Sequence, residues 1–535
     1  MIFRLGLATL VLFLVLIQPN HPGAMTWGAL RLFPLELPAI ILTLVALGDG
    51  RMGRLVRGAL VFALTLIVVL KTADIVSFNA LSRGFNPVAD MLLVDAFVRL
   101  LAGAVGGVLA GLAVLGAVLS IFAIAAALWW SMRVWAGLSV PGARLFALPA
   151  AVACALVVAQ VGQSMGTWRL PFPSPGAAFT ARVGAERVSL VRRTVAEIAA
   201  FREEVKQDPF TDARDLLDQI DRDVLVIFVE SYGRTSHDTP LYANVHRETM
   251  ARYEAQLSAA GLTMQSGFLE APTRGGQSWL SHATLANGLW VNNQVRYGAA
   301  LASGRETLFH HAANNGFSTA AVMPQITLDW PESEVMGFDE VLAAKDLGYR
   351  GLPFNWVTMP DQFTLAALDR LVRHDVDANR FVQVALATSH APWVPVPEIL
   401  PWDALGDGQV FNDVATSGDT PEVVWRDRDR IRAQYSLAID YALSAVFEYA
   451  LRHAADPPLM VVLGDHQAAE FVALDWRAHV PVHVIGPQRL VQALSQIAPD
   501  PGLLPGADTV PIPMDKVRDI FLDAYSSRIA VMADD

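Results

Sequence analysis

The sequence predicts an α/β protein in which an N-terminal bundle of about five transmembrane helices precedes a domain with a mainly parallel sheet sandwiched by helices. The first reason is composition: 53% of the 535 residues are hydrophobic and 17% are charged, whereas soluble domains carry about 25% charged residues. The apolar excess lies in the first third of the chain. The second reason is that short apolar runs alternate with helical patterns after residue 216, as in sheets that are buried on both faces.

Five apolar segments fill the first third of the chain, and a helix needs about 20 apolar residues to cross a bilayer. The first two segments are short, so their helices have to extend into flanking residues. Gly103, Gly107 and Gly111 fit either close helix packing or plain tolerance of glycine in a membrane helix. Lys71 and Asp74 fit either lipid-headgroup binding or a local ion pair at the interface. The five segments are residues 5–17, 32–47, 58–75, 100–130 and 145–161.

Basic residues in the short loops predict the orientation, because Lys and Arg concentrate on the cytoplasmic side of a membrane. With five spans they all fall on the side of the N-terminus, which places the large C-terminal part outside the cytoplasm. We therefore expect a multi-pass protein of the cytoplasmic (inner) membrane, with an anchor over residues 1–165, a juxtamembrane linker over 166–215 and a periplasmic or extracellular domain over 216–535. The basic residues are Arg4, Arg51, Arg54, Arg57, Arg133 and Arg144.

Charge and cysteine content exclude two classes of site. The net charge is −12 and the chain has no block of Lys and Arg, so nucleic acid is not an expected partner. The single cysteine, Cys154, lies in an apolar segment. Disulfides within the chain, cysteine metal sites and a cysteine nucleophile are therefore excluded.

Polar side chains follow three of the predicted strands. Glu230 follows the strand over residues 224–229, Asp465 and His466 follow 459–463, and His390 follows 381–387. Further strands are predicted over 264–269, 319–323 and 480–485. Because ligands bind outside the carboxyl ends of parallel strands, we expect these four side chains to share one site. The alternative for a single strand-end carboxylate is an N-cap of the next helix.

Two carboxylates and an imidazole suit one divalent metal ion, Mn²⁺ or Zn²⁺, with Mg²⁺ as a third option. The candidate for a reacting oxygen lies in the segment TRGGQSWLSHATLANG, residues 273–288, where Ser278 follows two glycines and opens a predicted helix over 279–286. A serine in that position is often only a helix cap. However, the N-terminus of a helix also binds phosphoryl groups, and a metal ion would lower the pKa of the hydroxyl enough to make it a nucleophile.

Three motifs resemble those of one family: VIFVESYG, GGQSWLSHATLANG and VVLGDH. They are similar to the sulfatase-like branch of the alkaline phosphatase superfamily, and within it to lipoteichoic acid synthases and related phosphoglycerol or phosphoethanolamine transferases. The resemblance covers most of residues 220–490 and implies an alkaline-phosphatase/sulfatase-like domain. It also implies that Glu230, Asp465 and His466 bind the metal, that Ser278 is a nucleophile which also touches the metal, and that His390 binds the substrate.

The resemblance implies a membrane-anchored transferase that takes the headgroup of a phospholipid in the bilayer. Ser278 would attack the phosphorus, diacylglycerol would leave, and a hydroxyl of an envelope glycan or polymer would displace the resulting phosphoserine diester. The chain departs from the family at three positions. Ser278 stands where the synthases have threonine, Gln277 where they have lysine, and Glu332 where they have arginine, so the headgroup stays open between phosphoglycerol and phosphoethanolamine.

Three more residues are candidates near the site, and a fourth is weighed and set aside. Trp330 matches an aromatic residue at the donor headgroup. His479 precedes a predicted strand and is a candidate second phosphate ligand. Arg274 fits either a phosphate contact or a salt bridge. Asp361, which follows Thr358-Met359-Pro360, reads most simply as a helix N-cap.

Other functions remain as alternatives. A hydrolase of phosphate or sulfate esters would use water as its acceptor. A true sulfatase needs a modified Cys or Ser in a Cys/Ser-x-Pro-x-Arg frame, and the segment from Ser278 to His282 lacks both the proline and the arginine. A non-catalytic envelope-assembly protein would be expected to lose the nucleophile or a metal ligand, and all four positions are intact. A transporter would show paired broken helices or repeat symmetry, which the spans lack.

Overall fold

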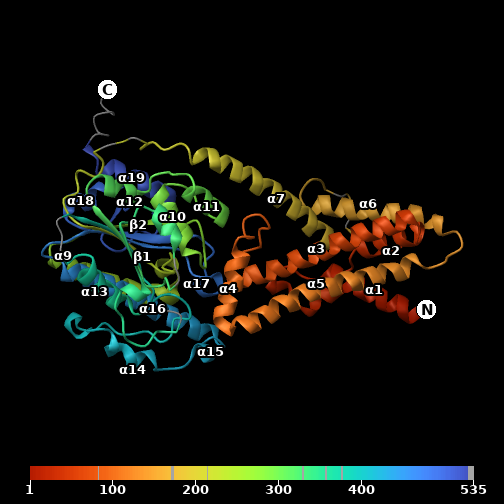
Figure 1. The fold of residues 1–535 in the computed structure, drawn as a ribbon, viewed down its shortest axis with the longest axis horizontal. Helices are drawn as coiled ribbons and strands as arrows, with labels where there is room; N and C mark the ends of the chain where they lie inside the picture. The colour runs from red at the N-terminus through yellow and green to blue at the C-terminus, as the bar shows by residue number, and fades with distance from the viewer. Residues whose placement is uncertain are drawn as a thin grey trace. The chain divides into compact units, whose positions relative to one another are not determined.

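The computed structural model describes residues 1–527, except residues 82, 170, 172–173, 212, 214, 328–329, 356–357 and 375–377 and the side chains of residues 100 and 104. The chain divides into two compact units, Met1–Ala200 and Phe201–Asp535 (Figure 1).

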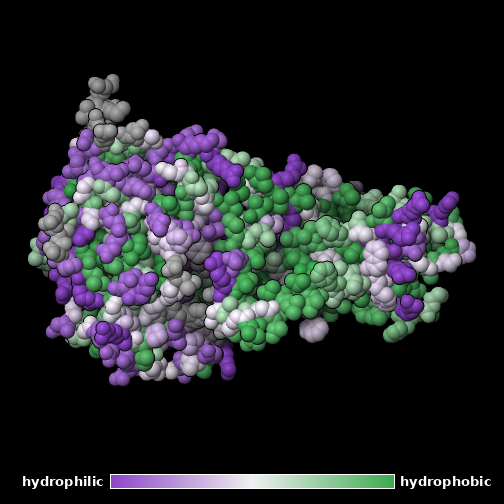
Figure 2. All heavy atoms as spheres, viewed as in Figure 1, coloured by the Kyte–Doolittle hydropathy of each residue, from purple (hydrophilic) through white to green (hydrophobic). Residues whose placement is uncertain are grey.

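The first unit is helical, and all five expected apolar segments form helices in it. Three helices of the described residues are long and apolar enough to cross a membrane, Arg51–Leu81, Gly107–Ala136 and Ala143–Ser164, while two shorter apolar helices precede them. Hydrophobic residues predominate on the face of this unit that Figure 2 shows. The helices are α1 (Ile2–Ile17), α2 (Glu36–Leu47), α3 (Arg51–Leu81), α4 (Leu93–Val105), α5 (Gly107–Ala136), α6 (Ala147–Ser164) and α7 (Phe179–Glu204).

The fourth expected span is wrong in one respect, because it is two helices and not one. Gly106 has φ +86°, a left-handed conformation that interrupts the helical hydrogen bonding between α4 and α5. Gly103 therefore lies on α4, while Gly107 and Gly111 lie on α5. A Cβ atom at any of these three glycines would meet nothing within 4 Å, so they make no close helix contact with the described residues.

Lys71 and Asp74 do not pair with each other, which corrects the expected local ion pair. Lys71 Nζ donates to Thr180 Oγ1 at 2.8 Å, and Asp74 forms an ion pair with Arg187. Both Lys71 and Asp74 are fully buried within the unit, which also argues against an exposed headgroup site there. Both partners lie on α7, so these two charges of α3 hold that helix.

One face of α7 makes polar contacts at regular intervals. Thr180 and Arg187 contact Lys71 and Asp74, and Thr194 Oγ1 accepts a hydrogen bond from Asn86 Nδ2 at 3.0 Å. The three α7 positions are seven residues apart, which is about two helical turns. They therefore lie on the same side of the helix.

The second unit is built on one mixed sheet in the order β4-β3-β5-β1-β6-β7-β2-β8, with β9 beside β2. The five strands from β4 to β6 are parallel; β7 is antiparallel to β6, and β2 is antiparallel to β7. Thus β2 points the same way as β1. The strands are β1 (Val224–Val229), β2 (Thr263–Glu270), β3 (Ser318–Met323), β4 (Glu340–Ala343), β5 (Arg380–Ala385), β6 (Leu459–Gly464), β7 (His479–Gly486), β8 (Asp500–Pro501) and β9 (Ile512–Pro513).

Alternate residues of β1 face two separate hydrophobic cores, because successive side chains of a strand point to opposite faces. Leu225 and Ile227 pack with α9 (Pro240–Ala259), α13 (Asp361–Leu371) and α16 (Arg428–Arg452). Val226 and Phe228 pack with α12 (Leu308–Asn314), α18 (Gln488–Ala493) and α19 (Val517–Ala524). The sheet is therefore covered by helices on both faces, as the apolar runs predict. Shorter or flanking helices are α8 (Thr235–Asp238), α10 (Ser278–Asn287), α11 (Gln294–Leu301), α14 (Asn412–Ala415), α15 (Pro421–Val424) and α17 (Glu470–Ala473).

A buried hydrogen-bonded chain joins β2 and β7 to α8 and to the loop that follows β1. Ser266 Oγ donates to the carbonyl of Gly502 at 2.6 Å, so it must accept from His483 Nδ1 at 2.8 Å. His483 Nε2 then accepts from the Tyr232 hydroxyl at 2.9 Å, and that hydroxyl accepts from His237 Nε2 at 2.9 Å. This pattern is that of a neutral His483 with its proton on Nδ1, and it places a proton on Nε2 of His237.

Acid is expected to destabilise this unit through the two imidazoles. Burial lowers the pKa of His483 to about 3 and, with the charge of His483, lowers the pKa of His237 well below its usual value. A depressed folded-state pKa means that the stabilisation is complete above the unfolded-state pKa of about 6.5 and is lost as the pH falls below it. Each imidazole should cost about 1.4 kcal/mol per pH unit between pH 6.5 and 5.

Thermal unfolding of the purified protein in detergent between pH 7.5 and 5 measures this effect. His483→Asn should lower the Tm at pH 7.5 and flatten its decline with acid. Substitution of the exposed His374 by Gln is the matched control and should leave the pH profile unchanged. A Tm that is constant from pH 6.5 to 5 in the wild type would refute the neutral, buried state of these histidines.

Candidate metal centre and nucleophile

The candidate site lies at the edge of the sheet where the parallel strands end. Glu230 directly follows β1, Asp465 and His466 directly follow β6, and His390 lies in the loop after β5. The strand β1 lies between β5 and β6 in the sheet, so the three loops are neighbours. Because β2 points in the same direction as β1, the chain also delivers Ser278, which follows β2, to this edge.

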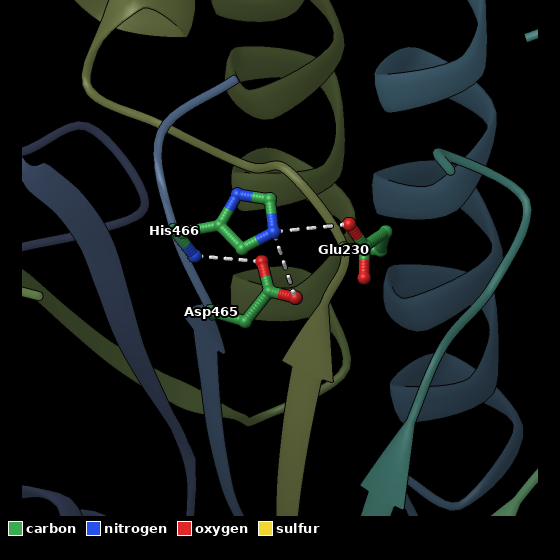
Figure 3. A group of neighbouring side chains, drawn as sticks. All are labelled: Glu230, Asp465 and His466. Carbon is green, nitrogen blue, oxygen red and sulfur yellow. Dashed lines mark hydrogen bonds and ion pairs between the residues drawn. The ribbon is translucent and has the colours of Figure 1, made fainter. Parts of the chain in front are cut away.

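Glu230, Asp465 and His466 converge on one point (Figure 3). Each offers a ligand atom, and these atoms all lie within 4.8 Å of one another. His466 Nε2 is 3.2 Å from Glu230 Oε1 and 3.8 Å from Asp465 Oδ2, and all three side chains are buried. Within the described part of the chain, no other group of three His, Cys, Asp or Glu side chains is placed to share a metal ion.

The imidazole of His466 is oriented by its own loop. Its Nδ1 lies 3.1 Å from the carbonyl oxygen of Gln467, and a carbonyl can only accept, so Nδ1 carries the proton and donates. The lone pair of Nε2 then faces the two carboxylates. A histidine whose second nitrogen is fixed by a carbonyl in this way is typical of metal ligands.

The two carboxylates are also held from behind. Asp465 Oδ1 accepts hydrogen bonds from the backbone N–H groups of Ser231 at 2.8 Å and His466 at 2.6 Å. Glu230 Oε1 accepts from Ser231 Oγ at 3.0 Å, and the backbone oxygen of Glu230 accepts from Ser389 Oγ at 2.6 Å. These bonds fix both the side chains and the backbone that carries them.

Burial and mutual charge shift the pKa values of all three groups. Burial and the neighbouring Glu230 carboxylate raise the pKa of Asp465 to about 8. Burial acts to lower the pKa of His466, but the charges of Asp465 and Glu230 outweigh it and raise this pKa to about 9. For Glu230, burial acts to raise the pKa, but the charges of His466 and His390 act to lower it, and the net shift is downward. The protein side of the site thus attracts positive charge.

These residues fit a divalent metal ion. Three electron-rich ligand atoms approach one another here, which is unfavourable unless a cation or protons bind between them, and the raised pKa values of Asp465 and His466 reflect such protons. A bound divalent cation would accept all three atoms, and its binding would replace the protons that the shifted pKa values indicate. Nitrogen and carboxylate oxygen are ligands of both Zn²⁺ and Mn²⁺.

Ser278 contacts this group directly. Its hydroxyl donates to Glu230 Oε2 at 3.0 Å. The residue is the first of α10, so its oxygen lies beside the free N–H groups and the positive dipole end of a helix. It is partly exposed, unlike the three buried side chains, and a substrate can therefore reach it.

Left-handed backbone conformations aim the two central loops. Ser231, just after Glu230, has φ +57°, and Gln277, just before Ser278, has φ +67°. Such conformations cost non-glycine residues about 1 kcal/mol or more and cluster at functional sites. The last residue of β6, Gly464, has to be a glycine. A Cβ there would lie 1.8 Å from the backbone oxygen of Tyr232, because the loop after β1 runs next to this strand end.

His390 lies in the neighbouring loop, half-buried, and its charge acts on Glu230. Its Nδ1 lies 2.7 Å from the carbonyl oxygen of Ala391. The carbonyl accepts, so Nδ1 donates, and Nε2 is the nitrogen left for a substrate.

The remaining candidates have other contacts. Arg274 donates to the backbone oxygen of Trp476, which corrects the alternative of a salt bridge. His479 is the first residue of β7 and pairs with Glu270 at the same sheet edge. Trp330 packs its ring against Phe338, with centroids 6.2 Å apart. For His479 and Trp330 the described contacts are with residues outside the metal group.

Sequence reasoning missed the residues that support the site. Ser231, Gln467 and Ser389 act through hydrogen bonds to the three metal-binding candidates, and each adjoins a residue that the motifs single out. Asp361 is not a helix N-cap, because its carboxylate bonds to the loop after β5 and not to α13. Its place directly after Pro360 carried no signal for that contact.

Residues 222–474 match the family model described as Sulfatase. No curated protein sequence matches the chain. The structure is similar to the lipooligosaccharide phosphoethanolamine transferase A of Neisseria meningitidis, with 13% identity over 87% of this chain and 84% of that one and a TM-score of 0.45. It is also similar to the phosphoglycerol transferase GacH of Streptococcus pyogenes, with 13% identity, 64% and 96% coverage and a TM-score of 0.36. The lipoteichoic acid synthase LtaP of Listeria monocytogenes aligns with 13% identity, 61% and 81% coverage and a TM-score of 0.33.

Proposed function

From the sulfatase-family domain that the chain carries over residues 222–474, we propose that the protein is a membrane-anchored, metal-dependent transferase. It moves the phosphoglycerol or phosphoethanolamine headgroup of a phospholipid onto an envelope glycan or polymer. The observation that carries the proposal is the 3.0 Å contact between Ser278 Oγ and Glu230 Oε2. That contact puts a partly exposed hydroxyl on the rim of a buried group that fits a divalent cation.

The chemistry follows from the placement of these residues. A divalent cation held by Glu230, Asp465 and His466, Zn²⁺ or Mn²⁺, would supply positive charge to the serine oxygen and the phosphoryl group. Ser278 Oγ forms a bond to phosphorus, and the bond between phosphorus and the diacylglycerol oxygen breaks. The proton of Ser278 passes to Glu230 Oε2, which accepts its hydrogen bond. The diacylglycerol oxygen takes a proton from the His390 imidazolium or, where His390 only binds the phosphate, from solvent. An acceptor hydroxyl then displaces the headgroup and gives up its proton to His390 or to solvent, and Ser278 takes its own proton back.

The membrane helices give this reaction its setting, because the donor lipid cannot leave the bilayer. We place the anchor at residues 1–165, the linker at 166–215 and the catalytic domain at 216–535, outside the cytoplasm. Trp330, His479 and Arg274 stand as candidates for headgroup or phosphate contacts. The donor phospholipid, the bilayer and an envelope acceptor are the partners in this proposal.

The test is mass spectrometry of the protein isolated from its own membrane. A peptide that contains Ser278 should carry a phosphoglycerol or phosphoethanolamine adduct, and its mass identifies the headgroup. Purified protein mixed with fluorescent phospholipid should release diacylglycerol. Ser278→Ala should lack the adduct while it keeps its metal, since three ligands remain.

Two outcomes would contradict the proposal. Release of diacylglycerol by Ser278→Ala at the wild-type rate would remove the serine from the reaction. Turnover of a soluble sulfate or phosphate ester without any turnover of phospholipid would instead assign the protein to the ester hydrolases.

A further inference from the structure

The carboxylate of Asp361 is buried and bonds to a different segment from its own helix. It is the first residue of α13 and is fully buried. Its Oδ1 accepts the backbone N–H groups of Ala387 at 2.6 Å and Thr388 at 2.9 Å. In return the backbone N–H of Asp361 donates to Thr388 Oγ1 at 2.9 Å. A buried carboxylate is costly unless it accepts hydrogen bonds, and both backbone N–H groups that donate to this one belong to a single turn of the chain.

That turn carries two contacts to the candidate site. Ser389 Oγ donates to the backbone oxygen of Glu230 at 2.6 Å. His390 is the next residue, and its own backbone N–H donates to the carbonyl of Ala387 at 3.0 Å. The turn that Asp361 holds therefore sets the position of His390 and supports the strand end that carries Glu230.

The far side of the turn is fixed as well. Trp393 Nε1 donates to the carbonyl of Ser389 at 2.6 Å, and the Trp393 ring lies against Tyr435 with centroids 5.5 Å apart. The Tyr435 hydroxyl donates to the backbone oxygen of Ser231 at 2.9 Å. Asp361 is the charged member of this set and the one that binds the turn from the α13 side.

We propose that Asp361 is a positioning residue that acts through His390. Its Oδ1 oxygen holds the turn over residues 387–390 so that the His390 imidazole faces the group formed by Glu230, Asp465, His466 and Ser278. The role depends on an oxygen acceptor at that point. The kinetic test of this role rests on the proposed function, whereas the hydrogen-exchange test does not.

The kinetic test is a double-mutant cycle. Asp361→Ala should lower kcat with the phospholipid donor on the order of 100-fold, the loss expected when a catalytic group is misplaced by about 1 Å. Asp361→Asn keeps the acceptor oxygen and should recover activity to within about fivefold of the wild type. If Asp361 acts through His390, the double variant Asp361→Ala/His390→Ala should lose no more than His390→Ala alone. Multiplied losses would overturn the proposal.

Asp369 provides the matched control. It lies on the same helix, and its carboxylate bonds to Tyr449 and His453, which are outside the candidate site. Asp369→Ala should lower the Tm and leave kcat within about twofold of the wild type. An equal loss of kcat in Asp369→Ala would reduce the Asp361 effect to general loss of stability.

Hydrogen exchange gives a readout that needs no substrate. Peptides covering residues 386–394 should exchange faster in Asp361→Ala than in the wild type or in Asp369→Ala, because two amides lose their acceptor. Unchanged exchange in these peptides would overturn the proposal even if activity fell. If the wild type turns over no phospholipid but the peptides still exchange faster in Asp361→Ala, the proposed function is contradicted and the positioning role of Asp361 stands.

Discussion

Asp465→Asn should abolish tight binding of a divalent cation and lower turnover on the order of 1,000-fold. The loss reflects several kcal/mol of charge stabilisation that a bound metal ion gives to a phosphoryl transition state. Asparagine keeps the Oδ1 acceptor for the N–H groups of Ser231 and His466, so the loop should keep its fold. Metal content by mass spectrometry and titration calorimetry with Mn²⁺ and Zn²⁺ measure the binding.

Two controls belong with this variant. Asp500→Asn changes a carboxylate whose Oδ2 accepts from Gly506 N at 2.7 Å, away from the candidate site, and should leave metal binding unchanged. Removal of the metal from the wild type with a chelator should lower its turnover to that of Asp465→Asn. Added Mn²⁺ or Zn²⁺ should restore the turnover of the wild type and not that of the variant. Wild-type metal affinity in Asp465→Asn would remove this residue from the ligand set.

Ser278→Ala should lower turnover on the order of 10,000-fold or more, since loss of a nucleophile is among the largest effects of a single side chain. Metal affinity should fall little, because Glu230, Asp465 and His466 remain. Ser278→Thr keeps a hydroxyl at the same point and should retain activity within about tenfold of the wild type. Initial rates of diacylglycerol release measure all of these effects.

Ser281 is the matched control on the same helix. Its side chain is buried, and its hydroxyl has no hydrogen-bond partner among the described residues. Removal of that hydroxyl in Ser281→Ala should therefore leave turnover unchanged. If Ser278→Ala and Ser281→Ala were equally active, the nucleophile would have to be sought elsewhere.

Much of the fold could be predicted because burial on both faces leaves a simple signature. The apolar run over residues 224–229 coincides with β1, and the run over 459–463 lies within β6. The direction of a parallel sheet then brings the strand ends together, and so the convergence of Glu230, Asp465 and His466 was within reach of the sequence. The weakly apolar β4 and the two-residue strands β8 and β9 carry no such signature.

The supporting contacts were out of reach for a physical reason. Asp361 and Ala387 meet through one side chain and a backbone N–H, and backbone groups are the same in every residue. Nor does any local pattern encode the left-handed conformations of Ser231 and Gln277, which tertiary contacts impose against local preference. Gly106 divides an apolar stretch that is continuous in hydropathy, so only its conformation reveals the break between α4 and α5.

The polar contacts of α7 depend on the number of residues between them, because each inserted residue rotates the following side chains about the helix axis. Each residue of an α-helix turns the chain by about 100°, so one residue inserted between Thr180 and Arg187 would swing Arg187 a quarter-turn or more away from Asp74. An insertion of seven residues would nearly restore the azimuth but would move Arg187 about 10 Å along the helix axis, so it too would separate Arg187 from Asp74. The spacing between Thr180 and Arg187 is therefore constrained both in rotation and in rise.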